Sequence, residues 1–491
     1  FFGSPVAAYT IESHFDIQRE YNTTTGVPSN VISENTADRP WHQRRFMRVD
    51  WSQNVVGQPT LFGFGSLNGM LSGWSNNAFF VQPDDRTSPD RPVITRDYFD
   101  ITNMYALSPS QSYCLFQLLF NSVPRCGVAN VKARLSFRKV DPTNDYEALY
   151  YPDRLEYRDD DGNPLVLDDR DLECEANDSP DFGDCFVRGY NYDGRFGNFR
   201  INRVAFSTER FQTPAGRVFL AGRYDLWEDS FDETGARIPF SARTPQPVVY
   251  YTNPKVPEYI REASENIASW WAKPFNESVA FRMGFTNEAG NLPDVEAYKQ
   301  EMVEAYGGEP SDWDMFQHRR NSCNRENVIA YAASNDMQSV IDEVAGGNEQ
   351  IFSGNVERVC AALQYEDLQR GKTLDPSVAR RTGRELAFTW ERLGDLRYNF
   401  DNYVIQLTGG PLGVAQFGQD PETGEFVSNI ANTFGDAIDR FAGSSLDLIQ
   451  WLNGDLATED ILRGNVTREF TQIPTRDYGI RDELKNAIAE L

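Results

Sequence analysis

The sequence predicts an α+β protein: a β-rich N-terminal region, a mixed α/β domain with a helical insertion, and a helical tail. Two observations lead to this prediction. Residues 131–140 alternate apolar and basic side chains, which is typical of a strand with one solvent-facing side. Residues 248–251 form a short apolar, β-favouring run, and apolar residues at helical spacing follow from Pro257 onward. We therefore expect a β-rich part followed by a strand that leads into a long helix.

The composition indicates a large folded protein with an acidic surface. With 491 residues, of which 40% are hydrophobic, the chain has room for about two to four domains. Its 73 acidic and 47 basic residues give a formal net charge of −26, which disfavours a nucleic-acid or anionic-membrane partner. No apolar run approaches the roughly 18 to 20 residues of a membrane-spanning helix. We interpret the charge as a solvated surface, with attraction for cations or basic partners as the alternative.

Six cysteines fall in three close pairs along the chain. Their spacing favours sequential disulfides, with free core thiols as the alternative. Disulfides indicate an oxidising compartment, so we expect a secreted protein of the extracellular space or the outer cell envelope. Since the chain begins at Phe1 and ends within a helical pattern, we expect it to derive from a longer precursor. The expected pairs are Cys114 with Cys126, Cys174 with Cys185, and Cys323 with Cys360.

Residues 1–130 predict an irregular, β-rich region. Residues 46–51 alternate like a half-buried strand, and a short helix is expected at 115–120. The stretch 61–69 is rich in glycine but lacks the spacing and the Lys-Ser pair of a phosphate loop. We interpret it as a glycine-rich turn.

Residues 131–240 predict a β-rich accessory domain. Residues 157–167 are typical of a hairpin, and further strands are expected at 200–206 and 218–224. Aspartates at this hairpin could bind calcium, but the spacing and the closing glutamate of an EF-hand are missing. We favour an acidic turn, with calcium as the alternative cofactor.

Residues 241–432 predict a mixed α/β domain. Pro257 and Glu258 suit the first turn of its long helix, because no N–H is needed there and the helix dipole is positive at that end. We expect a strand at 281–285 after this helix, and we interpret His318, beside two arginines, as a surface residue. The apolar stripe expected to lie against the sheet is Ile260, Ala263, Ile267, Trp270 and Trp271.

A helical insertion, 286–395, interrupts this domain, and a helical tail, 433–491, follows it. A disulfide between Cys323 and Cys360 would close a loop in the insertion and stabilise it by roughly 3 to 4 kcal/mol, mainly through the unfolded state. The expected helices are 294–306, 356–368 and 375–386 in the insertion, and 434–452, 455–462 and one beginning at 482 in the tail.

Several short motifs are more informative together than alone. They are the strand and helix at 247–275, Phe-Gly-Asn-Phe-Arg at 196–200, Ala-Gly-Arg-Tyr-Asp-Leu-Trp at 221–227, Gly-Asp-Leu-Arg-Tyr-Asn-Phe at 394–400, Gly-Pro-Leu-Gly at 410–413 and Asp-Pro-Glu-Thr-Gly-Glu at 420–425. This combination resembles a group of large bacterial envelope proteins, zinc-dependent metalloproteases of the zincin type. The resemblance covers roughly residues 130–455 and implies a zincin-like fold for residues 241–432.

The chain lacks the residues that zincin catalysis requires. Two histidines one helical turn apart must bind Zn²⁺, and a glutamate between them activates water. The only histidines are His14, His42 and His318, and no two lie within a few residues of each other. We therefore predict no catalytic or metal-ligating residue and no cofactor in this chain. In the resembling family the metal helix follows the segment that matches 420–453, so zinc is expected on a downstream segment or a partner chain of the same precursor.

The resemblance also implies a substrate cleft along one strand. In zincins an edge strand lines the cleft, where its backbone can pair with an extended peptide. Strands are expected at 412–417 and at 426–431, and either could be this strand, an ordinary internal strand being the alternative. The residues that would contact substrate are Leu412, Val414, Gln416, Phe426 and Ser428.

Two functions follow from these observations. In the first, the chain is the N-terminal, non-catalytic part of a secreted zinc-metalloprotease-like hydrolase, and it provides the sheet, the cleft edge and accessory domains to a zinc-bearing segment. In the second, a protease-derived fold serves as a structural or binding module, with other extracellular or envelope proteins as partners. A zinc-bearing partner polypeptide distinguishes the first function from the second.

Overall fold

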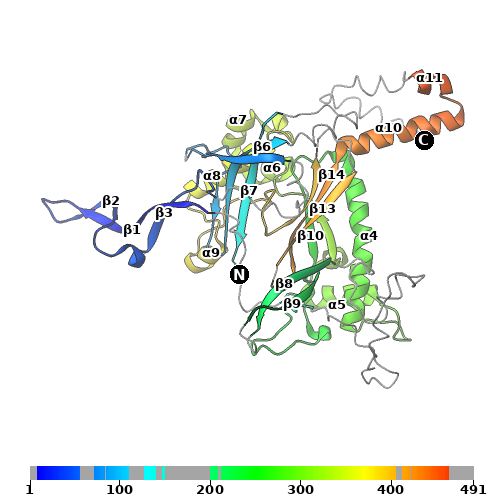
Figure 1. The fold of residues 1–491 in the computed structure, drawn as a ribbon, viewed down its shortest axis with the longest axis horizontal. Coiled ribbons are helices and arrows are strands. Elements are labelled where there is room, and N and C mark those ends of the chain that lie inside the picture. The colour runs from blue at the N-terminus through cyan, green and yellow to red at the C-terminus, as the bar shows by residue number, and fades with distance from the viewer. Residues whose placement is uncertain are drawn as a thin grey trace.

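The computed structural model describes residues 8–55, 71–82, 84–109, 127–139, 146–149, 199–207, 212–404, 412–420 and 422–463. Within these residues both strands and helices are abundant, in agreement with the predicted α+β class (Figure 1). The predictions that lie outside them are the glycine-rich turn, the helix at 115–120, the acidic hairpin with its calcium alternative, Cys114, Cys126, Cys174, Cys185 and the helix beginning at 482.

The first N-terminal sheet extends away from the rest of the molecule. It contains β1 (Thr10–Tyr21), β2 (Pro28–Asn35) and β3 (Phe46–Asp50) in the antiparallel order β2-β1-β3. This sheet is drawn in dark blue in Figure 1. Most side chains of β1 and β3 are exposed, so the sheet has little hydrophobic core of its own.

The second N-terminal sheet is built around β6 (Tyr98–Pro109). The strands β4 (Leu71–Asn77), β5 (Val93–Ile94) and β7 (Ala129–Arg138) all pair with β6 in antiparallel fashion. β7 confirms the strand predicted at 131–140. A separate hairpin of two further strands, β8 (Phe199–Ser207) and β9 (Gln212–Gly222), confirms the strands expected in the accessory region.

A mixed five-stranded sheet forms the centre of the α/β domain. Its spatial order is β11-β10-β12-β14-β13. The first four strands in this order run parallel, and β13 runs antiparallel at the edge. The strands are β10 (Val248–Thr252), β11 (Phe316–Arg319), β12 (Asn399–Val404), β13 (Gly413–Gln419) and β14 (Phe426–Phe434).

The helix that follows β10 is longer than the sequence predicts. α4 spans Glu258–Met283 and continues through Pro274. The strand predicted at 281–285 is therefore wrong, since its first three residues form the last turn of α4. α4 ends at Gly284, whose left-handed conformation (φ 93°) directs its N–H to two carbonyl groups of the last turn.

The buried face of α4 also differs from the predicted apolar stripe. Ile267 is 51%, Trp270 76% and Trp271 56% exposed, so these three residues are not covered by the sheet. Small side chains form the buried face instead, because they allow the helix to approach its neighbours closely. The buried residues are Ser264, Ala268, Ala272, Asn276, Val279 and Ala280.

The insertion folds around a disulfide-linked hydrophobic core. Cys323 and Cys360 are both buried in this core and form a disulfide with a Cα–Cα distance of 6.0 Å, which confirms that predicted pair. α5, α8 and the shorter α9 confirm the three predicted helices, whereas α6 and α7 were not predicted. The helices are α5 (Val295–Tyr306), α6 (Arg325–Ser334), α7 (Gln338–Ala345), α8 (Val356–Gln369) and α9 (Pro376–Thr382).

The insertion also supplies an edge strand of the main sheet. β11 lies within residues 286–395 and pairs with β10, with His318 opposite Tyr250. The His318 side chain is 8% exposed, so its interpretation as a surface residue is wrong. The four letters Phe-Gln-His-Arg show no alternation of apolar residues. The burial of His318 comes from pairing across 68 positions of sequence, which no local pattern encodes.

Two helices of the tail were predicted correctly. α10 (Gly435–Asn453) begins directly after β14, and α11 (Thr458–Arg463) follows it. In Figure 1 α10 extends beyond the edge of the sheet. Its apolar residues Phe441, Leu448 and Leu452 are exposed. None of the helices in the described ranges combines the length and the apolar character that crossing a membrane requires.

A buried carboxylate joins the second N-terminal sheet to the insertion. Arg392 donates a hydrogen bond to Asp100, and Arg134 Nη1 lies 3.3 Å from Asp100 Oδ1. The Tyr98 hydroxyl donates to the same carboxylate at 2.9 Å. The side chains of Asp100 and Arg392 are 0% and 4% exposed. Since water does not solvate these charges, each depends on the other for its stability.

Replacing Asp100 tests this junction. Asp100→Asn leaves two buried guanidinium groups without their carboxylate, so we expect the free energy of unfolding to fall by about 3–5 kcal/mol in denaturant titrations. Asp97→Asn is the matched control, because Asp97 forms an exposed ion pair with Lys139 at 3.8 Å. The control should change stability by roughly 0–1 kcal/mol. Equal effects of the two substitutions would contradict a special role for Asp100.

Candidate functional site

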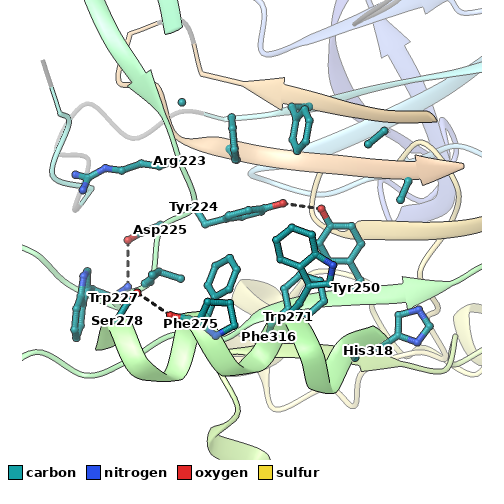
Figure 2. Close-up of a pocket in the computed structure, with 18 of the residues that line it drawn as sticks. Arg223, Tyr224, Asp225, Trp227, Tyr250, Trp271, Phe275, Ser278, Phe316 and His318 are labelled. Atoms are coloured by element: carbon teal, nitrogen blue, oxygen red, sulfur yellow. Dashed lines mark hydrogen bonds between the residues drawn. The ribbon is translucent and has the colours of Figure 1, made fainter. Parts of the chain in front are cut away.

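An aromatic cavity of about 830 Å³ lies between α4 and one face of the five-stranded sheet. Figure 2 shows rings from α4 and from the strands directed toward one another inside it. A cavity of this size with mainly apolar walls is typical of binding sites. The aromatic residues that line it are Tyr146, Tyr224, Trp227, Phe240, Tyr250, Trp271, Phe275, Phe316, Phe417 and Phe426.

The rings of the cavity form a continuous chain of contacts. Phe417 and Phe426 have ring centroids 5.0 Å apart, and Phe426 and Tyr224 5.1 Å. From Tyr224 the chain continues to Phe275 at 5.8 Å and then to Phe316 at 5.7 Å. These distances lie in the favourable range for aromatic pairs. The chain therefore connects the antiparallel edge β13 with the opposite edge β11.

The register of the strands explains why these residues share one face. Side chains alternate along a strand, so every second residue of β10 points to the cavity. Tyr250 does so, and its partner in β11 is His318. Near the β13 edge of the sheet, Ala415 of β13 pairs with Ala431 of β14, and both residues line the same cavity.

Two tyrosine hydroxyls meet inside the cavity. The oxygens of Tyr224 and Tyr250 lie 2.7 Å apart (Figure 2). Burial raises the pKa of both phenols, and for Tyr250 the neighbouring Tyr224 hydroxyl and the Asp401 carboxylate add to this effect. Both groups are therefore neutral at physiological pH. They can bind a polar group by hydrogen bonds, but they do not supply a phenolate.

A histidine and a carboxylate mark one end of the cavity. His318 Nε2 lies 3.1 Å from Asp401 Oδ2, and the Thr433 hydroxyl donates to Asp401 Oδ1 at 3.4 Å. These residues come from β11, β12 and β14, and all three line the cavity. His318 donates to the carboxylate when its Nε2 carries the proton. This end can thus attract a cationic group.

The opposite end of the cavity contains a compensated charge cluster. Glu147 pairs with Arg243 at 2.7 Å and with Arg237 at 2.8 Å. Burial alone would raise the pKa of Glu147, but the hydrogen bonds from the two arginines outweigh burial and lower it. Because its charges are already paired, this end is structural.

The described residues contain no group of three or more His, Cys, Asp or Glu side chains that could hold a metal ion. His14 and His42 both lie against Trp41 in the N-terminal sheet region, with ring centroids 5.3 and 5.7 Å from it. His318 belongs to the main sheet. The three histidines are thus not brought together as one ligand set.

The two candidate cleft strands occupy different positions in the sheet. Val414 and Gln416 belong to β13 at the edge, and Leu412 directly precedes this strand. Phe426 and Ser428 belong to β14, an internal strand between β12 and β13. Of the two candidate strands, β13 is therefore the one at an edge of the sheet within the described part of the chain. Phe426 lines the aromatic cavity, and Ser428 is buried and donates to the Tyr398 carbonyl at 2.8 Å.

Comparison with known proteins provides no relative: no family model, no curated protein and no solved structure matches this chain. Sequence reasoning also did not single out the aromatic residues as a binding site. The available signals were the alternation in 248–251 and the spacing of Trp271 and Phe275. Neither signal shows which side of α4 remains open.

The turn before β14 closes against the end of β9 near the cavity. Gly424 adopts φ +82°, and a Cβ atom there would lie 2.5 Å from the Ala221 carbonyl oxygen. The turn therefore requires glycine at this position. The next residue, Glu425, pairs with Arg223 through the backbone in an isolated parallel β-bridge. Burial, reinforced by the charges of Asp225 and Asp420, raises the pKa of Glu425 to about 7.

This raised pKa predicts a pH-dependent stability. The unfolded Glu425 carboxyl ionises near 4.5 and the folded one near 7, so stability falls as the pH rises through this interval. Glu425→Gln removes the ionisation, and it should raise the free energy of unfolding by about 1–2 kcal/mol at about pH 8 with no gain at about pH 4.

The matched control is Glu422→Gln, an exposed glutamate of the same turn. Urea titrations of the three proteins across this pH range measure the effect. A Glu425→Gln variant whose stability follows the parent at every pH would contradict the assignment.

Proposed function

We propose that this chain is the non-catalytic part of a secreted, zinc-metalloprotease-like protein of the zincin type. In this role it provides the central sheet, the edge of a peptide-binding cleft and accessory domains to a polypeptide that carries zinc. The observation that carries the proposal is the arrangement of the main sheet, with parallel strands, the long helix α4 after β10, and one antiparallel strand at the edge.

The start of the α/β domain supports the proposal. The sequence resemblance rests on a strand that leads directly into a long helix. β10 ends at Thr252, and α4 begins at Glu258 and runs for 26 residues along the sheet. Parallel strands need such a crossover connection, and here β11 joins the sheet beside β10.

The position of β13 supports a peptide-binding edge. β13 pairs with β14 along Gly413–Gln419, and its other edge has no strand partner among the described residues. An extended peptide can add to such an edge by main-chain hydrogen bonds, while alternate side chains enter pockets. In the extended sheet, the side chains of Val414 and Gln416 would then lie on one face, and those of Ala415 and Phe417 on the other face.

The chain does not itself supply the zinc ligands that this proposal requires. Its histidines belong to separate parts of the structure, as described above. The two histidines and the glutamate of the metal helix would therefore come from a downstream segment or a partner chain of the same precursor. There the metal would activate water for peptide hydrolysis.

A second candidate function is a structural or binding module without catalytic activity. The exposed apolar side chains of α10 favour it, because contiguous apolar surface is typical of protein contacts. In this case the partner would be another extracellular or envelope protein. The same aromatic cavity and free edge would serve assembly instead of cleavage.

Non-reducing intact mass spectrometry combined with zinc analysis of the native secreted material distinguishes these functions. We expect a co-purifying polypeptide with two histidines one helical turn apart and about one zinc ion per complex. A native preparation that contains this chain alone, without zinc, would contradict the protease role and leave the assembly module as the function.

A further inference from the structure

A second cavity, of about 460 Å³, lies where the second N-terminal sheet meets the insertion, and we call it the junction cavity. β6 and β7 contribute Thr102, Lys132 and Arg134 to its wall, and the segment before β12 contributes Trp390 and Arg392. At about 30 Å³ per water molecule, the cavity has room for roughly fifteen waters. It is therefore much larger than an inorganic ion and lies in the size range of small-molecule sites.

Two polar atoms on the wall of the junction cavity lack hydrogen-bond partners. The Thr102 hydroxyl and Arg134 Nη1 are both buried, and neither makes a hydrogen bond among the described residues. Thr102 is 5% exposed and lies directly opposite Arg134 in the pairing of β6 with β7. Opposite residues of an antiparallel pair share one face of the sheet. Because a buried polar atom without a partner costs free energy, a ligand with acceptor oxygens would stabilise both groups at once.

Positive charge exceeds negative charge at the buried end of this cavity. Arg392 donates a hydrogen bond to Asp100, whereas Arg134 Nη1 lies 3.3 Å from the same carboxylate without hydrogen-bond geometry. A single carboxylate thus serves two guanidinium groups. Another buried carboxylate of this region, Asp395, is paired with Arg397 at 2.7 Å. Burial and the charge of Arg392 lower the pKa of Arg134, so its cationic form is incompletely compensated.

The exposed end of the junction cavity carries two lysines that already have carboxylate partners. Lys132 Nζ lies 2.6 Å from Asp90 Oδ2, and Lys255 Nζ lies 3.9 Å from Glu357 Oε2. All four residues line the cavity, and their charges balance. The lysine side chains are about half exposed, so solvent screens both pairs. The positive charge in excess therefore remains with the buried arginines.

A carboxylate with an apolar body matches this wall. It offers one negative charge and two acceptor oxygens, which correspond to the excess charge and to the two donors, Arg134 Nη1 and the Thr102 hydroxyl. A divalent oxyanion such as sulfate would exceed that charge. Trp390 and Leu393 line the rest of the cavity and can contact hydrocarbon. The formal charge of −26 opposes an anion at long range, so the affinity must come from these local contacts.

We propose that the junction cavity binds a small organic acid, with its carboxylate at Arg134 and Thr102 and its apolar part against Trp390. The site is independent of the proposed function, because it shares no residue with the aromatic cavity or with β13. Arg134 also donates to the Leu393 carbonyl, 259 positions away in sequence. A bound acid would therefore stabilise the contact between the second N-terminal sheet and the insertion.

Calorimetric titration of the full chain at constant ionic strength tests the proposal. The probes are benzoate, its uncharged analogue benzamide, acetate, which has no large apolar body, and sulfate. We expect benzoate to bind at least about tenfold more tightly than each of the other three, because both the charge-assisted hydrogen bonds and the buried ring contribute. No binding of benzoate, or binding of any other probe as tight as that of benzoate, would overturn the proposal.

Thr102→Val locates the bound probe. This substitution removes a hydroxyl that has no partner among the described residues, so the variant should be as stable as the parent. We expect the affinity for benzoate to fall about fivefold or more. The matched control is Thr433→Val, which removes a hydroxyl from the aromatic cavity and should leave the affinity unchanged. Loss of affinity in the control alone would place benzoate in the aromatic cavity and overturn the proposal.

A pair of lysine substitutions tests the charge of the site. Lys132→Gln removes a positive charge from the wall of the junction cavity, and Lys139→Gln removes one from an exposed position outside it. We expect the first variant to bind benzoate about threefold more weakly and the second to bind it like the parent. Equal losses in the two variants would show a general effect of net charge and would contradict the assignment.

Discussion

The structure depends on the need of the five-stranded sheet to bury both of its faces. β10, β12 and β14 are internal strands, so their side chains leave water only if a layer covers each face. On one face Phe400 is fully buried beside Tyr398, and on the other the small residues of α4 allow a close approach. The aromatic cavity lies between α4 and this face and reaches from β11 to β13. The candidate site is therefore part of the way in which α4 covers the sheet.

The accessory parts are attached to this sheet by few but strong interactions. Asp100 with its two arginines ties the second N-terminal sheet to the segment that leads into β12. In the same region the Ser136 hydroxyl donates to the Gly394 carbonyl. Both contacts join positions more than 250 residues apart in sequence. A buried ion pair tolerates little movement, because displacing one partner leaves a charge without solvent. The second sheet is thereby held in a defined place relative to the main sheet.

Local sequence patterns predicted the helices and strands whose residues carry such a pattern. Elements that form only by pairing with a distant part of the chain were not predicted. Asp294 caps α5 by accepting the Ala297 N–H, which is a signal readable in the sequence. β10, α8 and the Cys323–Cys360 disulfide were likewise predicted from neighbouring residues. β11 was not predicted, since its four polar and aromatic residues become part of the sheet only by pairing with β10. The aromatic site was missed for the same reason: the direction in which Trp271 points depends on which side of α4 the sheet covers.

The alternation of side chains in β13 allows one strand to serve two surfaces. Its backbone edge away from β14 has no strand partner among the described residues, while Ala415 and Phe417 line the aromatic cavity between α4 and the sheet. A chain segment that paired with this edge and a ligand in the cavity would therefore contact different atoms of the same strand.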